Sequence, residues 1–499
     1  MQHVVGIDVG TSGVKVIVVD ETGRVRGEAT QPLRLSTPQP GWAEQNPEDW
    51  WTATRKAVRR ALGTAQVSRS QLGAVGLSGQ MHSAVFLDAQ GLVIRPALLW
   101  CDGRTSAECA DITTAVGAQR LRKTACNPAL EGFTLPKILW LRRHEPAAFR
   151  RLAKVVLAKD YIRFRLTGTL ATDPSDASAT LMFDTVKRTW SREVLDAVGL
   201  SRALTVDVVG STEPSGTVTR EAARQTGLPE GLVVAGGGAD NACGALGVGA
   251  IEPGVAVASW GTSGTVLAPT PLPLVDPALR VHTFCHAVPD TWYVMGVMLT
   301  AGGAFAWFRD QMARDLHRKT TGKSPELQLN EEAAGVPIGA AGLTFLPYLQ
   351  GERTPHRDAA ARGAFVGLSL AHDRAHLARA VLEGIAFGLR DSVSLLQDLE
   401  LPIARLLLTG GGAKSPFLRQ LQADVFGLPV VQVNRDEGPA FGAALLAAVC
   451  AGLYPNLGTA CRKTLTRLPP EKPNRKAHRS YDAPYARFRA LYPALKDHV

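Results

Sequence analysis

The sequence of 499 residues contains no apolar run that reaches the roughly 20 residues needed to cross a bilayer. The nearest candidate, FGAALLAAVCAGL at 441–453, is too short and is interrupted by glycine. No basic segment followed by a cleavable apolar stretch opens the chain. The seven cysteines show no CxxC spacing, which argues against a disulfide framework or a zinc site. We therefore expect a cytoplasmic protein without a membrane partner.

Two common glycine-rich nucleotide-binding motifs are also missing. There is no G-x-x-x-x-G-K-[ST] sequence, because GGGAKS at 410–415 has the lysine and the serine at the wrong spacing. No clean G-x-G-x-x-G opens a predicted helix. These absences argue against a P-loop or a Rossmann dinucleotide site.

The positive charge is unevenly spread along the chain. The formal net charge is +10, and residues 462–499 hold ten Lys or Arg against three acids, a net of +7. This stretch contains prolines and no recognisable nucleic-acid-binding module. We expect a solvated basic tail or helix there and no nucleic-acid partner.

A tetrapeptide repeat indicates how the chain is divided. A protein of this length is expected to hold two or three domains, and Gly-Thr-Ser-Gly occurs at 10–13 and again 251 residues later at 261–264. Each copy precedes a β-rich run, and strand and helix signals alternate in both halves. The sequence therefore predicts two related α/β domains, at 1–246 and 247–461, followed by the segment 462–499.

The first copy of the repeat lies in GIDVGTSGVKVIVVD, where two apolar runs flank the turn and predict a β-hairpin. Asp8 lies inside the first predicted strand, where a carboxylate is costly unless it is paired or bound to a cation. Asp8 is either a hydrogen-bonded residue at a strand end or a ligand of Mg²⁺, bound through water beside phosphates.

Three glycine-rich turns, at 10–13, 261–264 and 410–412, follow predicted strands. Backbone N–H groups and hydroxyls in such turns can surround anionic oxygens, although any one of them is more often an ordinary turn. Their occurrence in both halves favours a polyphosphate held in a cleft between the domains.

Polar side chains follow three further predicted strands. Asp240 and Asn241 come after the strand at 232–235, and Asp240 is either a helix cap or a general base that faces a substrate hydroxyl. Side chains suited to a sugar, with polar groups beside an apolar surface, are Gln80, Met81, His82, Trp100, Asp102 and Arg104. The residues alone predict a phosphoryl-transfer enzyme with two domains and a small polar substrate.

Taken together, these motifs resemble the FGGY carbohydrate kinases. The similarity extends to about residue 450 and includes GIDVGTSGVKV, PGWAEQNPEDWW, GLSGQMH, GGGADNACGALG, SWGTSGT and LTGGGAKS. It is greatest to the branch of that family that phosphorylates D-xylulose. The resemblance implies two related ribonuclease-H-like domains of the actin/hexokinase type, with the active-site cleft between them. It also implies ATP and Mg²⁺ as cofactors, and D-xylulose 5-phosphate and ADP as products.

The same resemblance implies roles for individual residues. Asp240 corresponds to the catalytic base, Asp8 to the residue that organises Mg²⁺, and Met81, His82, Asp240 and Asn241 to ketose contacts. The positions that correspond to ATP contacts are Thr11, Ser12, Lys15, Gly261, Thr262, Ser263, Gly410, Gly411, Ala413, Asn434 and Glu437.

Some alternatives stay open at this point. Glycerol kinases carry an Arg-Glu pair in place of Met81-His82, which argues against glycerol. The added Ala239, and Ser83 in place of a glycine, leave ribulose, L-xylulose, a polyol or gluconate as other acceptors. A sugar-responsive regulator without activity and a chaperone-like ATPase are more remote alternatives. A homodimer is compatible with the sequence.

Overall fold

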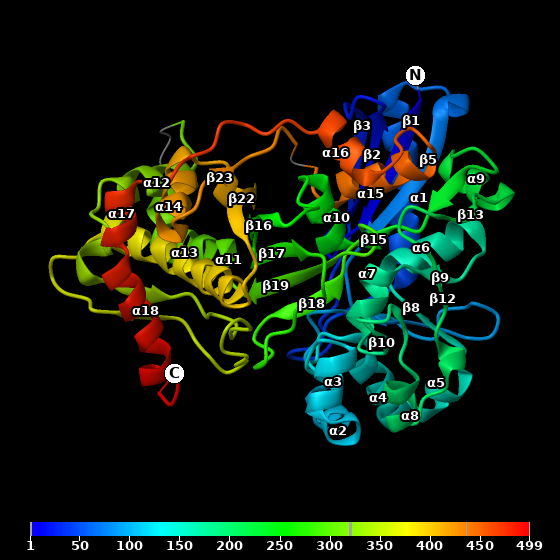
Figure 1. Cartoon of the computed structure of the whole chain (residues 1–499), viewed down its shortest axis with the longest axis horizontal. Helices are drawn as coiled ribbons and strands as arrows, with labels where there is room; N and C mark the ends of the chain where they lie inside the picture. The colour runs from blue at the N-terminus through cyan, green and yellow to red at the C-terminus, as the bar shows by residue number, and fades with distance from the viewer. Residues whose placement is uncertain (1, 319–321, 436, 499) are drawn as a thin grey trace.

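The computed structural model describes residues 2–318, 322–435 and 437–498. It contains two main β-sheets, each covered by helices, that lie side by side in Figure 1. The first sheet has the order β13-β14-β5-β1-β2-β3, and β15 also pairs with β5. Its strands are β1 (His3–Val9), β2 (Gly13–Asp20), β3 (Val25–Pro32), β5 (Leu72–Gly79), β13 (Pro214–Thr217), β14 (Val233–Ala235) and β15 (Gly238–Ala239).

The second sheet repeats this arrangement in the order β18-β19-β17-β16-β22-β23. Strands β16 and β17 form an antiparallel hairpin as β1 and β2 do, and β16 pairs in parallel with β22 as β1 pairs with β5. The two related α/β domains predicted from the repeat are thereby confirmed. The strands of this sheet are β16 (Gly254–Trp260), β17 (Gly264–Thr270), β18 (His282–Cys285), β19 (Trp292–Met298), β22 (Ile403–Gly410) and β23 (Val430–Val431).

Helices cover both faces of the first sheet, so its central strands are apolar on both sides. Helix α1 (Pro47–Ala65) packs on β2 and β3. It begins as the sequence predicts, with Pro47 in its first turn and the Asn46 side chain accepting a hydrogen bond from the amide of Glu48.

Helix α15 (Pro439–Cys450) covers the opposite face of this sheet although it comes from the second half of the chain. A Cβ atom on Gly6 or Gly76 would overlap the carbonyl oxygens of Ala440 and Ala443, so the missing side chains allow this close approach. The chain therefore passes between the two sheets twice, once after α10 (Asp240–Gly247) and again before α15. Within the described residues, no helix is both long enough and apolar enough to cross a membrane.

The C-terminal segment, expected as a solvated basic tail or helix, is helical, and part of it is buried. It forms α16 (Leu457–Thr464), α17 (Arg475–Ser480) and α18 (Asp482–Leu495), and α18 lies on the second domain (Figure 1). The aromatic side chains of Tyr481 and Phe488 are buried there. Both belong to the apolar core of the second domain, so apolar contacts attach this basic segment to it.

The remaining elements connect these layers. Long helix α13 (Arg374–Asp398) packs on β17 and β19, and α6 packs on α1 and β5. Helices α2 to α5 and α8 form a side lobe beside the first sheet in Figure 1. The other helices are α2 (Ser106–Val116), α3 (Ala118–Thr124), α4 (Thr134–His144), α5 (Pro146–Arg151), α6 (Ala158–Thr167), α7 (Pro174–Ala177), α8 (Arg192–Ala197), α9 (Arg220–Thr226), α11 (Gly302–Met312), α12 (Pro325–Ala334) and α14 (Pro416–Phe426). The short strands are β4 (Glu44–Gln45), β6 (Val85–Leu87), β7 (Ala97–Leu98), β8 (Lys154–Val156), β9 (Ala171–Thr172), β10 (Phe183–Asp184), β11 (Thr189–Trp190), β12 (Asp207–Val208), β20 (Thr344–Leu346) and β21 (Ala364–Val366).

Candidate active site

Parallel strands bring Asp8 and Asp240 to one edge of the first sheet. Strands β1 and β15 both pair in parallel with β5, so the carboxyl ends of all three meet at the same edge. Asp8 lies opposite Ser78, Ala239 lies opposite Gly79, and Asp240 is the next residue, the first of α10. The residue at the helix-cap position is Ala239, which leaves the Asp240 carboxylate available for another role.

Both carboxyl groups have raised pKa values, and the charge of Asp8 contributes to the shift of Asp240. Burial raises the pKa of Asp8 to about 6, against the opposing effects of the Ser78 hydroxyl and the Lys15 ammonium. Burial and then the charge of Asp8 raise the pKa of Asp240 to about 7, although Asp240 accepts hydrogen bonds from Asn241 N (2.7 Å) and Nδ2 (3.1 Å). Asp8 Oδ1 is buried without a hydrogen-bond partner. Such a pair suits a proton acceptor beside a cation.

The added Ala239 does not displace Asp240 from this edge. Ala239 is buried, pairs with Gly79 and donates its amide hydrogen to Ser175 Oγ at 2.9 Å. The extra residue therefore continues the strand, and the Asp240 carboxylate remains within electrostatic reach of Asp8.

The turn after β5 holds the predicted sugar contacts Met81 and His82. Asn241 Nδ2 lies 3.4 Å from Met81 Sδ, so Asn241 and Met81 are brought together. His82 adopts a left-handed backbone conformation with φ of 67°, and its Nδ1 lies 2.6 Å from the carbonyl oxygen of Ala179. Burial lowers the pKa of His82 to about 3, so its ring is neutral at physiological pH.

Hydrogen bonds connect the first glycine-rich turn to this sugar side. Thr11 Oγ1 donates to Gln80 Oε1 (3.0 Å) and accepts from Trp100 Nε1 (2.9 Å). Ser83 Oγ donates to the same oxygen of Gln80 (3.1 Å). The hydroxyl of Thr11 is therefore engaged within the protein, and Trp100 is fixed against the turn.

Asp102 and Arg104 are largely engaged with each other. Arg104 Nη2 donates to Asp102 Oδ2 at 2.7 Å, and the same carboxylate oxygen accepts the amide hydrogen of Ala43 at 2.6 Å. The Arg104 guanidinium also lies 3.5 Å from the ring centroid of Trp42. Their contact with the sugar stays a prediction, and the geometry indicates a supporting role beneath the site.

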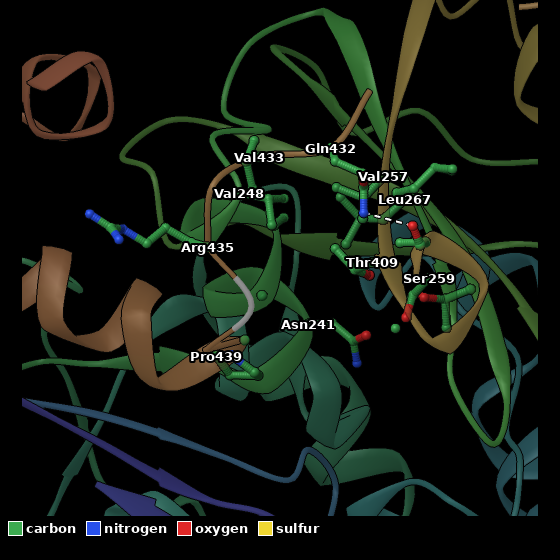
Figure 2. A pocket seen from close by; sticks show the side chains of 18 of the residues that line it. Asn241, Val248, Val257, Ser259, Leu267, Thr409, Gln432, Val433, Arg435 and Pro439 are labelled. Carbon is green, nitrogen blue, oxygen red and sulfur yellow. Dashed lines mark hydrogen bonds between the residues drawn. The ribbon is translucent and has the colours of Figure 1, made fainter. Parts of the chain in front are cut away.

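A pocket of about 510 Å³ lies between the two domains, beside Asp240. Figure 2 shows Asn241, Ser259 and Thr409 around this space, with Gln432 donating to the carbonyl oxygen of Ala413 at 2.6 Å. The predicted site residues that line it are Asp240, Asn241, Gly410, Ala413 and Asn434. Glu437 and the turn at 261–264 are outside this lining.

The second glycine-rich turn lies next to the turn at 410–412. Trp260 pairs with Gly410 across β16 and β22, and Gly410 has a φ of 78° and no room for a side chain, since a Cβ would lie 2.5 Å from Trp260 O. The carbonyl of Thr262 accepts the amide hydrogen of Gly303 at 3.0 Å, so this turn caps α11. The two turns adjoin at one edge of the second sheet.

Comparison with known proteins identifies the family of the chain. Residues 3–247 match the N-terminal domain and residues 256–451 the C-terminal domain of the FGGY family of carbohydrate kinases. The chain belongs to this family. It is therefore a carbohydrate kinase, as the motifs in its sequence predict.

Individual FGGY kinases are similar over almost the whole chain. A xylulose kinase from Escherichia coli (strain K12) is 42% identical over 98% of this chain and 99% of its own. The crystal structure of a xylulose kinase from Rhodospirillum rubrum has a TM-score of 0.90 at 32% identity and covers 99% of both chains. That of a gluconate kinase from Lactobacillus acidophilus has a TM-score of 0.91 at 27% identity, over 99% of this chain and 98% of its own.

Several residues of this FGGY kinase site were not predicted. Ser259, Thr409 and Gln432 line the pocket. Ser259 could have been found, because it stands 251 residues after Asp8 and so occupies the same place in the repeat. No local pattern in the sequence connects Lys137 with the site, because its buried Nζ reaches the carbonyl oxygen of His82 (3.3 Å) from a helix 55 residues further along the chain.

Proposed function

We propose that this FGGY kinase transfers the γ-phosphoryl group of ATP to the 5-hydroxyl of D-xylulose, with Asp240 as the general base. The observation that carries the proposal is the position of Asp240, which lines the pocket between the domains and adjoins the Met81–His82 turn. The identity to a xylulose kinase supports D-xylulose as the acceptor.

Asp240 accepts the proton of the sugar hydroxyl as that oxygen attacks the γ-phosphate. A pKa of about 7 leaves a useful fraction of the carboxyl ionised near neutral pH and makes it a better proton acceptor than an ordinary Asp. Phosphoryl transfer depends mainly on positioning and on neutralisation of charge. Closure of the two domains would align the groups and exclude water.

His82 contributes to recognition of the sugar through its neutral ring. Its Nδ1 faces the carbonyl oxygen of Ala179, so this nitrogen carries the proton. The other nitrogen, Nε2, is then a hydrogen-bond acceptor for a sugar hydroxyl. The apolar rings of Phe133 and Phe284, at 4.5 and 5.8 Å from the His82 ring, keep it in place.

Asp8 is the residue that would hold Mg²⁺. Its Oδ1 is buried without a partner, and carboxylate oxygen is the ligand that Mg²⁺ prefers together with water and substrate phosphates. No group of three or more His, Cys, Asp or Glu within the described ranges forms a complete protein cage for a metal ion. When bound, Mg²⁺ supplies positive charge to the phosphates of ATP.

The nucleotide occupies the pocket between the domains in this proposal. Gly410, Ala413 and Asn434 line it. At the two sheet edges, Thr11 offers its backbone amide, Ser12, Lys15, Thr262 and Ser263 offer side-chain donors, and Gly261 belongs to the second turn. Glu437 precedes Gly438 and Pro439, which line the pocket, and we propose that it contacts the nucleoside.

The acceptor is tested by ADP release from the purified protein with ATP and Mg²⁺. D-xylulose, ribulose, L-xylulose, glycerol and gluconate are compared, and D-xylulose should lead in kcat/KM by about tenfold, equivalent to about 1.4 kcal/mol. If gluconate leads, which the likeness to a gluconate kinase makes the second candidate, kinase activity stands and the acceptor is reassigned.

The base is tested with Asp240→Asn, which keeps the shape of the side chain and removes the proton acceptor. We expect kcat to fall by about 100-fold or more, because this is the usual contribution of a positioned base. Binding of a fluorescent ATP analogue serves as the control and should be retained. A kcat above about a tenth of the parent value would contradict this role.

A further inference from the structure

A buried ionic cluster is connected through Ser175 to Ala239, the residue before Asp240, and has no part in the proposed reaction. Lys159 Nζ lies 2.6 Å from Asp160, 2.9 Å from Asp173 and 2.9 Å from Asp176, and all four side chains are buried. Arg163 joins them through Asp160 at 2.6 Å. Replacing such a cluster by apolar residues is often neutral or stabilising, so stability alone does not explain it.

The cluster combines two basic side chains, Lys159 and Arg163, with three acidic ones, Asp160, Asp173 and Asp176. Burial, together with Asp160 and Asp173, raises the pKa of Asp176 well above its usual range, against the opposing effect of Lys159. Basic and acidic groups packed this closely limit the charge that the cluster adds near Asp8 and Asp240.

A continuous chain of hydrogen bonds leads from this cluster to the residue before Asp240. Asp173 Oδ2 accepts from the amide of Ser175 (2.9 Å) and from its hydroxyl (2.5 Å). Because the Ser175 hydroxyl donates to Asp173, its lone pairs are free to accept, and it receives the Ala239 amide hydrogen at 2.9 Å.

We infer that Ser175, Asp173 and Lys159 are positioning residues that fix the peptide of Ala239 and so aim the Asp240 carboxylate at the sugar hydroxyl. Lys159 holds the Asp173 carboxylate, Asp173 orients the Ser175 hydroxyl, and Ser175 holds the backbone. A catalytic group must be kept within about 0.5 Å of its productive position, which requires supporting bonds of this kind. The inference rests on the proposed role of Asp240.

The test compares Ser175→Ala with Ser178→Ala. Ser178 is a matched control, because its buried hydroxyl also accepts a backbone amide hydrogen, that of Cys285 at 3.1 Å, but does not contact Ala239. The Ser178 hydroxyl donates its own hydrogen to the carbonyl oxygen of Ser175 at 2.9 Å. We expect kcat to fall by about tenfold in Ser175→Ala at unchanged KM for sugar and ATP, and to stay within about twofold in Ser178→Ala. Equal kcat values for the two variants would overturn the inference.

A double variant separates positioning from a general structural effect. In the Asp240→Asn background, Ser175→Ala should cause no further loss of the residual rate, because it acts through Asp240. A further loss as large as in the parent would overturn the inference. If Ser175→Ala does not fold, Asp173→Asn provides the same comparison, since it keeps the size of the side chain and weakens the hold of Lys159.

The outcomes distinguish this inference from the proposed function. An active Asp240→Asn variant would remove the proposed base, and the positioning role with it. An inactive Asp240→Asn variant beside a normal Ser175→Ala variant would overturn the positioning role alone.

Discussion

The two Gly-Thr-Ser-Gly turns share their sequence and their place between paired strands, but the side chains around them differ. Each joins two antiparallel strands, β1 and β2 or β16 and β17. In each, the first glycine amide donates within the turn at 3.0 Å, from Gly10 to Gly13 O and from Gly261 to Ser263 O. The backbone alone therefore gives neither turn a distinct role.

The difference lies in the side chains around the turns. Two residues before the tetrapeptide, the first copy has Asp8 and the second has Ser259. Asp8 carries a buried carboxyl with a raised pKa, whereas Ser259 is an uncharged residue in the pocket between the domains. The same turn thus occurs twice, and in the proposed function Asp8, in place of Ser259, puts the reacting phosphate at the first domain.

Removing the charge of Asp8 should have the largest effect. Asp8→Asn is expected to lower kcat by about 100-fold or more, because electrostatic stabilisation at a reacting phosphate typically contributes that much. Ser259→Ala at the equivalent position should change kcat by less than about threefold and raise KM for ATP. Steady-state kinetics at saturating Mg²⁺ measure both, and similar kcat values for the two variants would contradict the assignment.

The same comparison predicts a pH dependence of stability. Asp8 and Asp240 have raised pKa values, of about 6 and about 7, so their contribution to stability is present below the ordinary Asp range and is lost as pH rises through those values. Without ATP and Mg²⁺, the free energy of unfolding should fall by about 1.4 kcal/mol per pH unit for each carboxyl still protonated in the folded protein.

Denaturant unfolding between pH 5 and 8 measures this effect as a difference between variants. Other buried acids such as Asp391 and Glu352 also have raised pKa values, about 6 and about 8, so the parent alone is not informative. Asp8→Asn should flatten the pH dependence, and Ser259→Ala should leave it unchanged. A parallel pH dependence for parent and Asp8→Asn would contradict the raised pKa of Asp8.

The threonines of the two turns should affect different substrates. Thr11→Val leaves Trp100 Nε1 without its acceptor, while Gln80 Oε1 keeps the Ser83 hydroxyl as a donor. One unsatisfied group costs about 1–3 kcal/mol. We expect KM for the sugar to rise by about tenfold, with KM for ATP less affected. Thr262→Val keeps the carbonyl that caps α11 and should change mainly KM for ATP. The same pattern in both variants would show that the turns are not specialised.

Local signals account for the parts of the structure that the sequence predicted. The hairpin at Asp8, the start of α1 at Asn46 and the helix α14 between Ser415 and Gly427 depend on neighbouring residues, such as caps and turn glycines. The motif resemblance added the family, which the comparison confirmed.

Long-range packing accounts for the parts that the sequence did not predict. Helix α15 returns to the first sheet because Gly6 and Gly76 leave space for it, and this contact joins residues more than 360 positions apart. The stacking of the Arg104 guanidinium on Trp42 likewise depends on how two segments 62 residues apart meet. No local pattern in the sequence predicts such contacts between distant segments.

Ser83→Gly should have the smallest effect. Ser83 Oγ donates to Gln80 Oε1 at 3.1 Å and accepts the amide hydrogen of Trp100 at 3.3 Å, so it reinforces the connection between the first turn and the sugar side. Both bonds are long, and their loss should cost about 0.5–1 kcal/mol. KM for D-xylulose should rise by about twofold to fivefold with kcat unchanged. KM for ATP is the internal control, because both Ser83 bonds lie on the sugar side and should leave it unchanged. If Ser83→Gly raises KM for ATP instead, the bonds around Gln80 serve the nucleotide rather than the sugar, and the side chains of the two turns are not specialised.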